Sequence, residues 1–167
     1  MILTTHAIVG AAVGRLVLNP YESFALGFIS HFLIDAIPHW AYPLASLIRD
    51  EKDPLKKDMI LDRRFIRDLI LVIIDFCSGV SLDIFVFQGA ISFINFSLPL
   101  LAGALGGVLP DALQFAYFKI RREPLITLQK LHIRVNGKED IFALPYGLLS
   151  QIILIIAVVI ISKLILQ

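Results

Sequence analysis

Two long apolar runs constrain this chain more than any other feature of its sequence. Phe65 to Gln88 and Leu144 to Leu166 are 24 and 23 residues long, and the second is almost wholly aliphatic. About 20 apolar residues, rising 1.5 Å each in a helix, cross the hydrocarbon core of a bilayer. Hydrophobic residues form 57% of the 167 residues and charged residues only 17%, which excludes a soluble globular enzyme, a disordered chain and a collagen-like fibre. We therefore predict an integral membrane protein.

Three shorter or interrupted apolar stretches complete the predicted bundle. They are Thr4–Leu18, with Thr4 or Thr5 as its N-cap, Glu22–Ile37, which Pro38 ends, and Ala90–Ile120, which contains Pro99 and Pro110. Short or interrupted apolar helices often pack inside a bundle beside a polar site. The sequence thus predicts an all-α, polytopic membrane helix bundle with about five transmembrane or re-entrant helices, in a single domain over residues 1–167. The first two helices either span the bilayer or form a re-entrant pair.

The basic residues predict the orientation of the bundle. Of 15 Lys and Arg, seven lie between Arg49 and Arg67 and six between Lys119 and Lys138. Because positively charged loops stay in the cytoplasm, we expect cytoplasmic loops near 45–64 and 119–142, a cytoplasmic N-terminus and a place in the cell (inner) membrane. The arginines of these loops (Arg63, Arg64, Arg121 and Arg122) are best read as topology signals, with anionic headgroup binding as the alternative. A net charge of +1 gives no field that would recruit nucleic acid, and the single Cys77 excludes an internal disulfide.

Polar side chains that are unusual in such a chain gather in one pattern. His31, Asp35 and His39 follow one another at steps of four residues. Four residues turn a helix by about 400°, so the three side chains share one stripe and can act as metal ligands. Under the predicted topology three further groups reach the same cytoplasmic level: His6 at the start of the first helix, Asp111 at the end of the fourth, and His132 in the second loop. This convergence predicts a metal site or a general acid–base site.

Each of these groups also has a structural interpretation. His6 could be a helix cap, His31 and Asp35 could form an interhelical hydrogen bond, Asp111 could belong to a turn, and His132 could lie on the surface. Ionisable groups within a membrane cost about 2.5–3.5 kcal/mol each on insertion scales, which favours a functional reason for keeping them. Asp75, in the middle of an apolar run, is more consistent with a structural hydrogen bond. The spacing of Gly10 and Gly14 predicts close packing of the first helix.

Four short motifs carry a resemblance. They are H-x-x-x-G at His6–Gly10, S-H-x-x-x-D-x-x-P-H at Ser30–His39, G-x-x-x-P-D at Gly106–Asp111 and L-H at Leu131–His132. With these motifs, over most of its length, the chain resembles the predicted membrane-bound metal-dependent hydrolases, a family of small multi-pass prokaryotic membrane proteins. The resemblance implies a hydrolase class and no particular substrate. Motifs of nucleotide-binding proteins, serine hydrolases and zincins are absent from the sequence.

The leading hypothesis is a metal-dependent hydrolase at the cytoplasmic membrane surface. His31, Asp35 and His39 would bind a divalent metal, zinc by preference, with His6 or Asp111 completing the ligand set. Asp111 by preference, or His132, would take the proton of the attacking water, and the substrate would be a phosphoester or lipid-like molecule. The alternative is a non-catalytic membrane scaffold or an ion- or proton-handling transport subunit, and a third hypothesis is purely structural contacts between helices.

Overall fold

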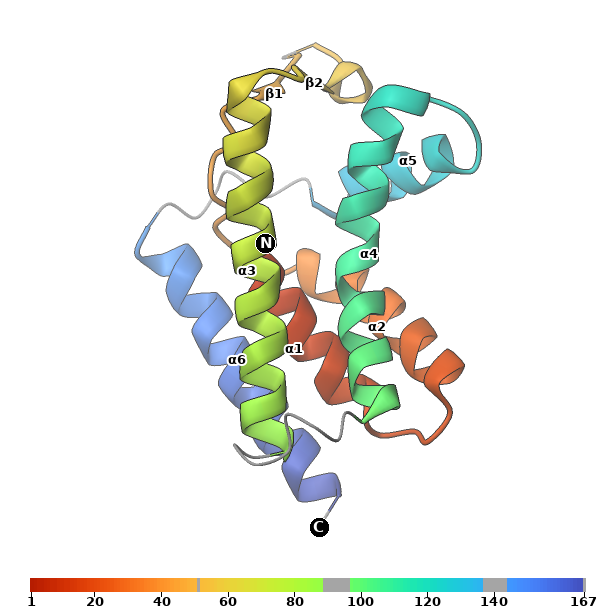
Figure 1. Cartoon of the computed structure of the whole chain (residues 1–167), viewed down its shortest axis with the longest axis vertical. Coiled ribbons are helices and arrows are strands. Elements are labelled where there is room, and N and C mark those ends of the chain that lie inside the picture. The colour runs from red at the N-terminus through yellow and green to blue at the C-terminus, as the bar shows by residue number, and fades with distance from the viewer. Residues whose placement is uncertain (51, 89–96, 137–143, 167) are drawn as a thin grey trace.

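The computed structural model describes residues 1–50, 52–88, 97–136 and 144–166. Within these ranges the chain is mostly helical, with one short antiparallel pair of strands (Figure 1). In chain order the elements are α1 (Leu3–Gly14), α2 (Pro20–Asp35), β1 (Leu47–Ile48), the 3-10 turn η1 (Pro54–Lys56), β2 (Asp58–Met59), α3 (Arg63–Gln88), α4 (Leu98–Ile120), α5 (Leu125–Val135) and α6 (Tyr146–Ile165).

Three helices of the described chain, α3, α4 and α6, are long and apolar enough to cross a membrane. They correspond to three of the predicted apolar stretches, although the expected start of one of them at Ala90 lies outside the described residues. The helices α1 and α2 have 12 and 16 residues. At 1.5 Å per residue they extend about 18 and 24 Å, less than the roughly 30 Å of a hydrocarbon core. The structure thus supports a membrane protein with three candidate spans, and five spans stay a prediction.

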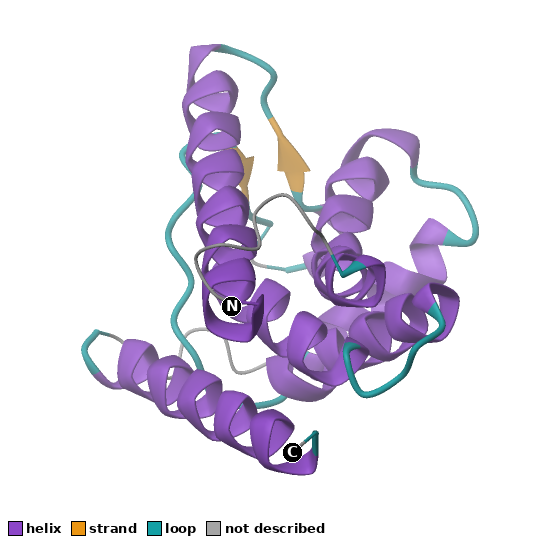
Figure 2. Ribbon diagram, turned by 60° about the horizontal axis from the view of Figure 1, so that its bottom comes forward, coloured by secondary structure: helices purple, strands orange, loops and turns teal. Residues whose placement is uncertain are grey.

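The shortest of the apolar helices is also the most deeply buried. Ten of the 12 residues of α1 are buried, because α2, α3, α4 and α6 surround it (Figures 1 and 2). Small side chains allow this packing: Ala7 and Ala11 form a cluster with residues of α4. A Cβ at Gly107 of α4 would overlap the backbone oxygen of His6, so the two helices approach as closely as only glycine permits. Gly10 lies at the same contact, as its spacing from Gly14 predicts.

The start of α1 is held by a side chain from another helix. Asp75, in the middle of α3, accepts hydrogen bonds from the backbone N–H groups of Leu3 (2.7 Å) and Thr4 (3.0 Å) and from the Thr4 hydroxyl (2.6 Å). The expected cap by Thr4 or Thr5 is therefore wrong, since the Thr4 hydroxyl is a donor to Asp75 and no side-chain cap comes from Ile2 at the N-cap position. The structural interpretation of Asp75 is confirmed.

Asp111 does not lie at the end of α4, contrary to the prediction. The helix continues through Pro110 to Ile120, so Asp111 lies nine residues before its end, about 14 Å along the axis. Pro110 removes one N–H from the helix, and on the turn before it Gly106 and Gly107 pack against the backbones of α2 and α1. Asp111 is consequently placed in the middle of α4 and not at a helix end.

The two predicted loops pack against each other at one end of the molecule. Met59 forms an apolar cluster with Tyr117 and Phe118 of α4, and the strands lie between the start of α3 and the end of α4 (Figures 1 and 2). Lys119 donates to Asp58 (2.7 Å), and this ammonium lowers the pKa of the Asp58 carboxyl. The predicted loop at 119–142 contains an unpredicted helix, α5, whose apolar side contacts this cluster through Leu125. Residues 137–142 of the predicted loop lie outside the described residues.

Candidate metal centre

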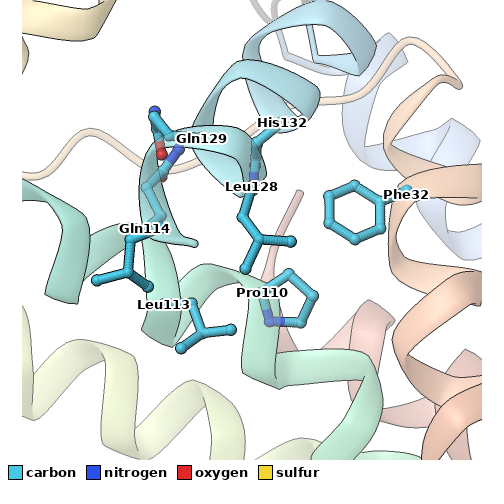
Figure 3. Close-up of a pocket in the computed structure, with 8 residues that line it drawn as sticks. Phe32, Pro110, Leu113, Gln114, Leu128, Gln129 and His132 are labelled. Carbon is cyan, nitrogen blue, oxygen red and sulfur yellow. The ribbon is translucent and has the colours of Figure 1, made fainter. Parts of the chain in front are cut away.

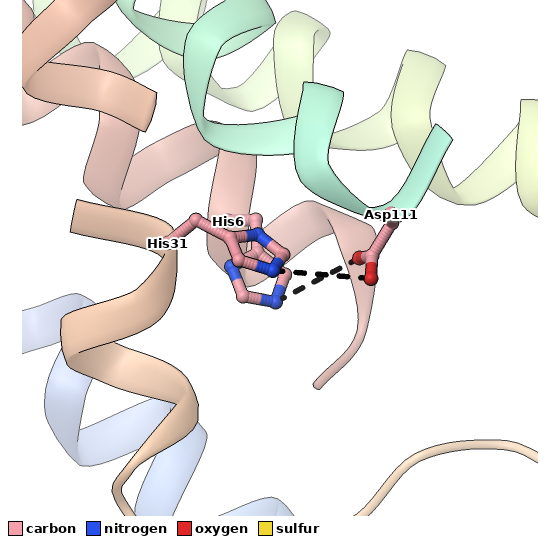
Figure 4. A group of neighbouring side chains, drawn as sticks. All are labelled: His6, His31 and Asp111. Atoms are coloured by element: carbon pink, nitrogen blue, oxygen red, sulfur yellow. Dashed lines mark ion pairs between the residues drawn. The ribbon is translucent and has the colours of Figure 1, made fainter. Parts of the chain in front are cut away.

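All six residues that the sequence singled out meet in the interior of the bundle. They come from four helices and one connecting segment: His6 from the first turns of α1, His31 and Asp35 from the last turns of α2, Asp111 from the middle of α4, His132 from the last turn of α5, and His39 from the segment after α2. Figure 4 shows the imidazoles of His6 and His31 directed at the Asp111 carboxylate. Residues far apart in the sequence therefore form one cluster.

Asp35 lies at the centre of this cluster. One carboxylate oxygen, Oδ1, is 3.2 Å from Nε2 of His6, and the other, Oδ2, is 3.3 Å from Nε2 of His31 and 3.4 Å from Nε2 of His132. The four side chains are buried, with the Asp35 side chain only 1% exposed. Ligand atoms bound tetrahedrally at about 2.0–2.2 Å from one ion lie about 3.3–3.6 Å from one another. The separations of His31 and His132 from one oxygen of Asp35 are therefore compatible with ligands of one metal ion.

Asp111 faces the same three imidazoles at a slightly greater distance. Its carboxylate oxygens are 3.9 Å from Nε2 of His6, 3.9 Å from Nε2 of His31 and 3.8 Å from Nε2 of His132. Its side chain is 26% exposed, whereas those of His6 and His31 are fully buried. Two sets of atoms could hold a cation: His6, His31 and Asp111, or His31, Asp35 and His132. Asp111 is the member of the cluster that is most open to the surroundings.

The atoms that face each other in the cluster do not satisfy each other by hydrogen bonds. Within the described residues, both ring nitrogens of His6, Nε2 of His31 and both carboxylate oxygens of Asp35 are buried without a hydrogen-bond partner. Hydrogen bonds between an imidazolium and a carboxylate are usually about 2.7–2.9 Å long, shorter than any of the separations in this cluster. Buried polar atoms in proteins are normally paired, so this many unpaired donor atoms around one point fit a bound cation.

The other nitrogen of His31 fixes the direction in which its ring can bind. Nδ1 lies 2.8 Å from the backbone oxygen of Gly107, and because a carbonyl only accepts, Nδ1 carries the proton and donates it. In the neutral imidazole, Nε2 then presents its lone pair to the cluster. This is the arrangement in which metal-bound histidines are typically held by a second partner. The His6 ring stacks on that of His31, with 4.0 Å between the ring centroids, so the two rings restrain each other.

His39 lies at the edge of the cluster. Its Nε2 is 3.9 Å from Asp35 Oδ1 and accepts a hydrogen bond from the amino group of Met1 (2.8 Å), while its Nδ1 donates to the backbone oxygen of Ile37 (2.7 Å). It is buried like the other histidines. His132, predicted to be an acid or base, lies closer to Asp35 than His39, predicted to be a ligand. The geometry therefore favours exchanging these two roles.

The side of the cluster that α5 covers is closed. Figure 3 shows Phe32, Pro110, Leu113 and Leu128 around a cavity of about 10 Å³ beside His132. A cavity of about 10–15 Å³ has room for one water molecule. The opposite side, toward α3, is open: a cavity of about 1090 Å³ is lined in part by Asp111 and His132. Tyr42 also lines this cavity, and burial, aided by the Asp75 carboxylate, raises the pKa of its phenol.

One supporting residue was not found by sequence reasoning. Gln151, buried on α6, accepts hydrogen bonds at Oε1 from the N–H of Ile2 (3.1 Å) and the hydroxyl of Thr5 (3.2 Å). Its Nε2 donates to the backbone oxygen of Trp40 (2.9 Å). It thus connects α6 to two residues that precede His6 and to the segment that contains His39. A lone glutamine in the otherwise aliphatic run from Leu144 was the available signal.

Comparisons with known proteins add nothing to this geometry: no family model matches the chain, and neither the curated proteins nor the solved structures gave a significant match. The resemblance to membrane-bound metal-dependent hydrolases accordingly stays a prediction, and the function has to be argued from the site.

Proposed function

We propose that this protein is a membrane-embedded, metal-dependent hydrolase. The single observation that carries the proposal is the cluster of buried donor atoms around Asp35, which lie 3.2–3.4 Å from three imidazole nitrogens without hydrogen bonding to them. Imidazole nitrogens and carboxylate oxygens are the donors that zinc and similar divalent ions bind in proteins. We assign His31, Asp35 and His132 as the ligands, with His6 facing the other oxygen of Asp35 and with zinc as the preferred ion.

Access to the site supports a catalytic role over a purely structural one. Structural zinc sites are closed, whereas catalytic sites keep one position open for water or substrate. Here the large cavity reaches the cluster at Asp111 and His132, and the Asp111 side chain is partly exposed. A divalent ion, when bound, would supply Lewis-acid activation of water and of the scissile group. The cavity gives a substrate the room to approach it.

The remaining residues take the other roles that hydrolysis requires. Asp111 is placed to accept the proton of the attacking water at a carboxylate oxygen, because it faces the three imidazoles from the exposed side of the cluster. Gly107 holds the His31 ring through its backbone oxygen, and Asp75 and Gln151 hold the start of the helix that carries His6. His39 is a positioning residue at the edge. We propose that hydrolysis takes place on the cytoplasmic side of the cell membrane.

Metal content and activity measured on the same preparation test this proposal. Protein purified in mild detergent should hold about one divalent ion per chain, and His31→Ala should hold none. Asp111→Asn should retain most of the ion but lower hydrolysis of an ester or phosphoester substrate by about 10²–10⁴-fold, the usual contribution of a general base. The matched control is Asp83→Asn, which removes another buried carboxylate, one on α3 that does not line the cavity.

Three results would count against the proposal. Wild-type protein without metal, in buffers free of chelator, would favour the non-catalytic scaffold or transport subunit. Equal metal content in the wild type and His31→Ala would remove the assigned site. Metal bound in the wild type, with no hydrolysis that a chelator abolishes, would leave a structural metal site only.

A further inference from the structure

The cavity beside the metal centre lies between α3 and α4, and we refer to it as the channel. Its volume is about 1090 Å³, slightly above the roughly 300–1,000 Å³ of small-molecule pockets. Its wall on α3 is a stripe of apolar side chains with helical spacing: Phe65, Leu69, Val72, Ile73 and Phe76. From the first to the last of these is 11 residues, about 16 Å along the axis. In a membrane protein a face this long and apolar packs against protein or lipid, and here it borders the cavity.

The facing wall on α4 is built in the same way. It presents Leu105, Val108, Leu109, Ala112 and Phe115, again at spacings of three and four residues. The Phe65 and Phe115 rings stack with 5.3 Å between their centroids, so the two helices touch near one end of the channel. The cavity lies between these two apolar stripes. Two helices that are each able to cross a membrane thus enclose an apolar channel.

Charged side chains line the channel beside its apolar stripes. Asp111 and His132 belong to the metal centre, and Arg49, Asp50, Lys57 and Asp68 come from the segment between α2 and α3 and the start of α3. Acidic and basic groups thus lie close together in this part of the lining. An apolar channel with charged groups of both signs beside it is complementary to an amphiphile that has a long hydrocarbon chain and a polar headgroup.

We propose that this channel binds one acyl chain of a membrane phospholipid, and that phospholipids are the substrate class of the metal centre. The second part rests on the proposed function. The length of about 16 Å along α3 matches one leaflet of a bilayer whose hydrocarbon core is about 30 Å thick. The channel lies between helices that would contact the bilayer directly, so a lipid could enter without crossing water. Asp111 and His132 then face a lipid that is already held by its chain.

Photo-crosslinking with a defined lipid tests the channel. The protein would be placed in phosphatidylcholine vesicles that contain phosphatidylglycerol with a diazirine in the middle of one acyl chain, and the labelled peptides identified by mass spectrometry. Wild-type protein should be labelled on the channel stripes of α3 and α4. The variant Val72→Trp/Leu109→Trp fills the channel from both walls and should lower this labelling at least about tenfold. The matched control is Ile74→Trp, on the same helix but outside the channel lining, which should leave it unchanged.

The same samples separate the two proposals, because their metal content is measured alongside. If the wild type is labelled, Val72→Trp/Leu109→Trp is not, and the protein holds no metal, the result would support the channel and contradict the proposed hydrolase. Equal labelling of the wild type, the filled variant and Ile74→Trp, in a protein that holds metal, would overturn the channel alone. The channel would also be overturned if the wild type is dimeric, the filled variant is monomeric and both are labelled equally. A second copy of the chain would then be the occupant. Val72→Phe, a milder filling, replaces the double variant if that aggregates, and should lower labelling in part.

Discussion

Replacing Asp35 by asparagine tests the metal centre at its central carboxylate. The substitution keeps the shape of a side chain that is 1% exposed and removes only its charge and one acceptor oxygen. If the imidazoles around it belong to a metal site, they are neutral and gain nothing from the Asp35 charge unless the ion is present. If they are instead protonated partners of Asp35, the charge stabilises the protein at all times. The first interpretation therefore predicts a loss of stability that depends on metal, and the second predicts a loss that does not.

The expected size of the effect follows from binding linkage. Zinc at 100 times its dissociation constant stabilises the folded state by about 2.7 kcal/mol. For a chain of this size, each kcal/mol shifts the melting temperature by about 2–4 °C, so zinc should raise it by about 5–11 °C. A weakening of zinc binding by about 100-fold in Asp35→Asn leaves about 0.4 kcal/mol at the same zinc concentration, or roughly 1 °C. In the presence of a chelator the two proteins should melt within a few degrees of each other.

Thermal unfolding in detergent, with zinc and with chelator, measures both quantities. The matched control is Asp83→Asn, because Asp83 is also fully buried but lies on α3 eight residues beyond Asp75, away from the cluster. Asp83→Asn should keep the full zinc-dependent shift. The reasoning is refuted if Asp35→Asn lowers the melting temperature equally with zinc and with chelator, since the carboxylate would then stabilise the fold through the imidazoles alone.

Two further substitutions test the elements that hold the centre. Gly107→Ala places a methyl group against the backbone oxygen of His6, so it should lower the free energy of unfolding by about 1–3 kcal/mol and abolish the zinc-dependent shift of the melting temperature. An unchanged shift would show that zinc binding does not need the close approach of α1 and α4. Asp75→Ala removes the cap of α1 and should lower the free energy of unfolding by about 0.5–2 kcal/mol, with Asp75→Asn costing less because its amide oxygen still accepts; equal losses in denaturant titrations would contradict this.

The sequence was sufficient to predict the membrane class and the members of the cluster, for physical reasons. Apolar runs such as Phe65–Gln88 have few alternatives to a long helix, and ionisable groups among them are costly enough to require a purpose. The four-residue spacing of His31 and Asp35 places both on one helical face, and the structure brings Nε2 of the first to 3.3 Å from the second. Local spacing and burial cost together were enough to select the residues.

The position of the cluster could not be predicted in the same way, because it depends on contacts between helices. Asp111 was expected at a helix end, but α4 continues through Pro110 and carries Asp111 in its middle, where Gly106 and Gly107 receive α2 and α1. The segment of α5 was predicted to be a loop because of its basic residues. These residues alternate with an apolar stripe that includes Leu125 and Leu128 and ends at His132. The helical spacing of these apolar residues indicates a helix only when the apolar surface that they cover, around Met59, is known.

The charge balance of the cluster gives an independent reason to expect a bound cation. With the imidazoles neutral, Asp35 and Asp111 carry two negative charges in and beside a buried region, and the amino group of Met1, 3.5 Å from Oδ1 of Asp35, offsets one of them. A protonated imidazole would offset the other, but it would draw the carboxylates into hydrogen bonds shorter than the observed 3.2–3.9 Å. A metal cation offsets the remaining charge at these separations. It also explains why the bundle places its small residues around α1: only close packing at Gly107 brings His6 and His31 to the same point as Asp111.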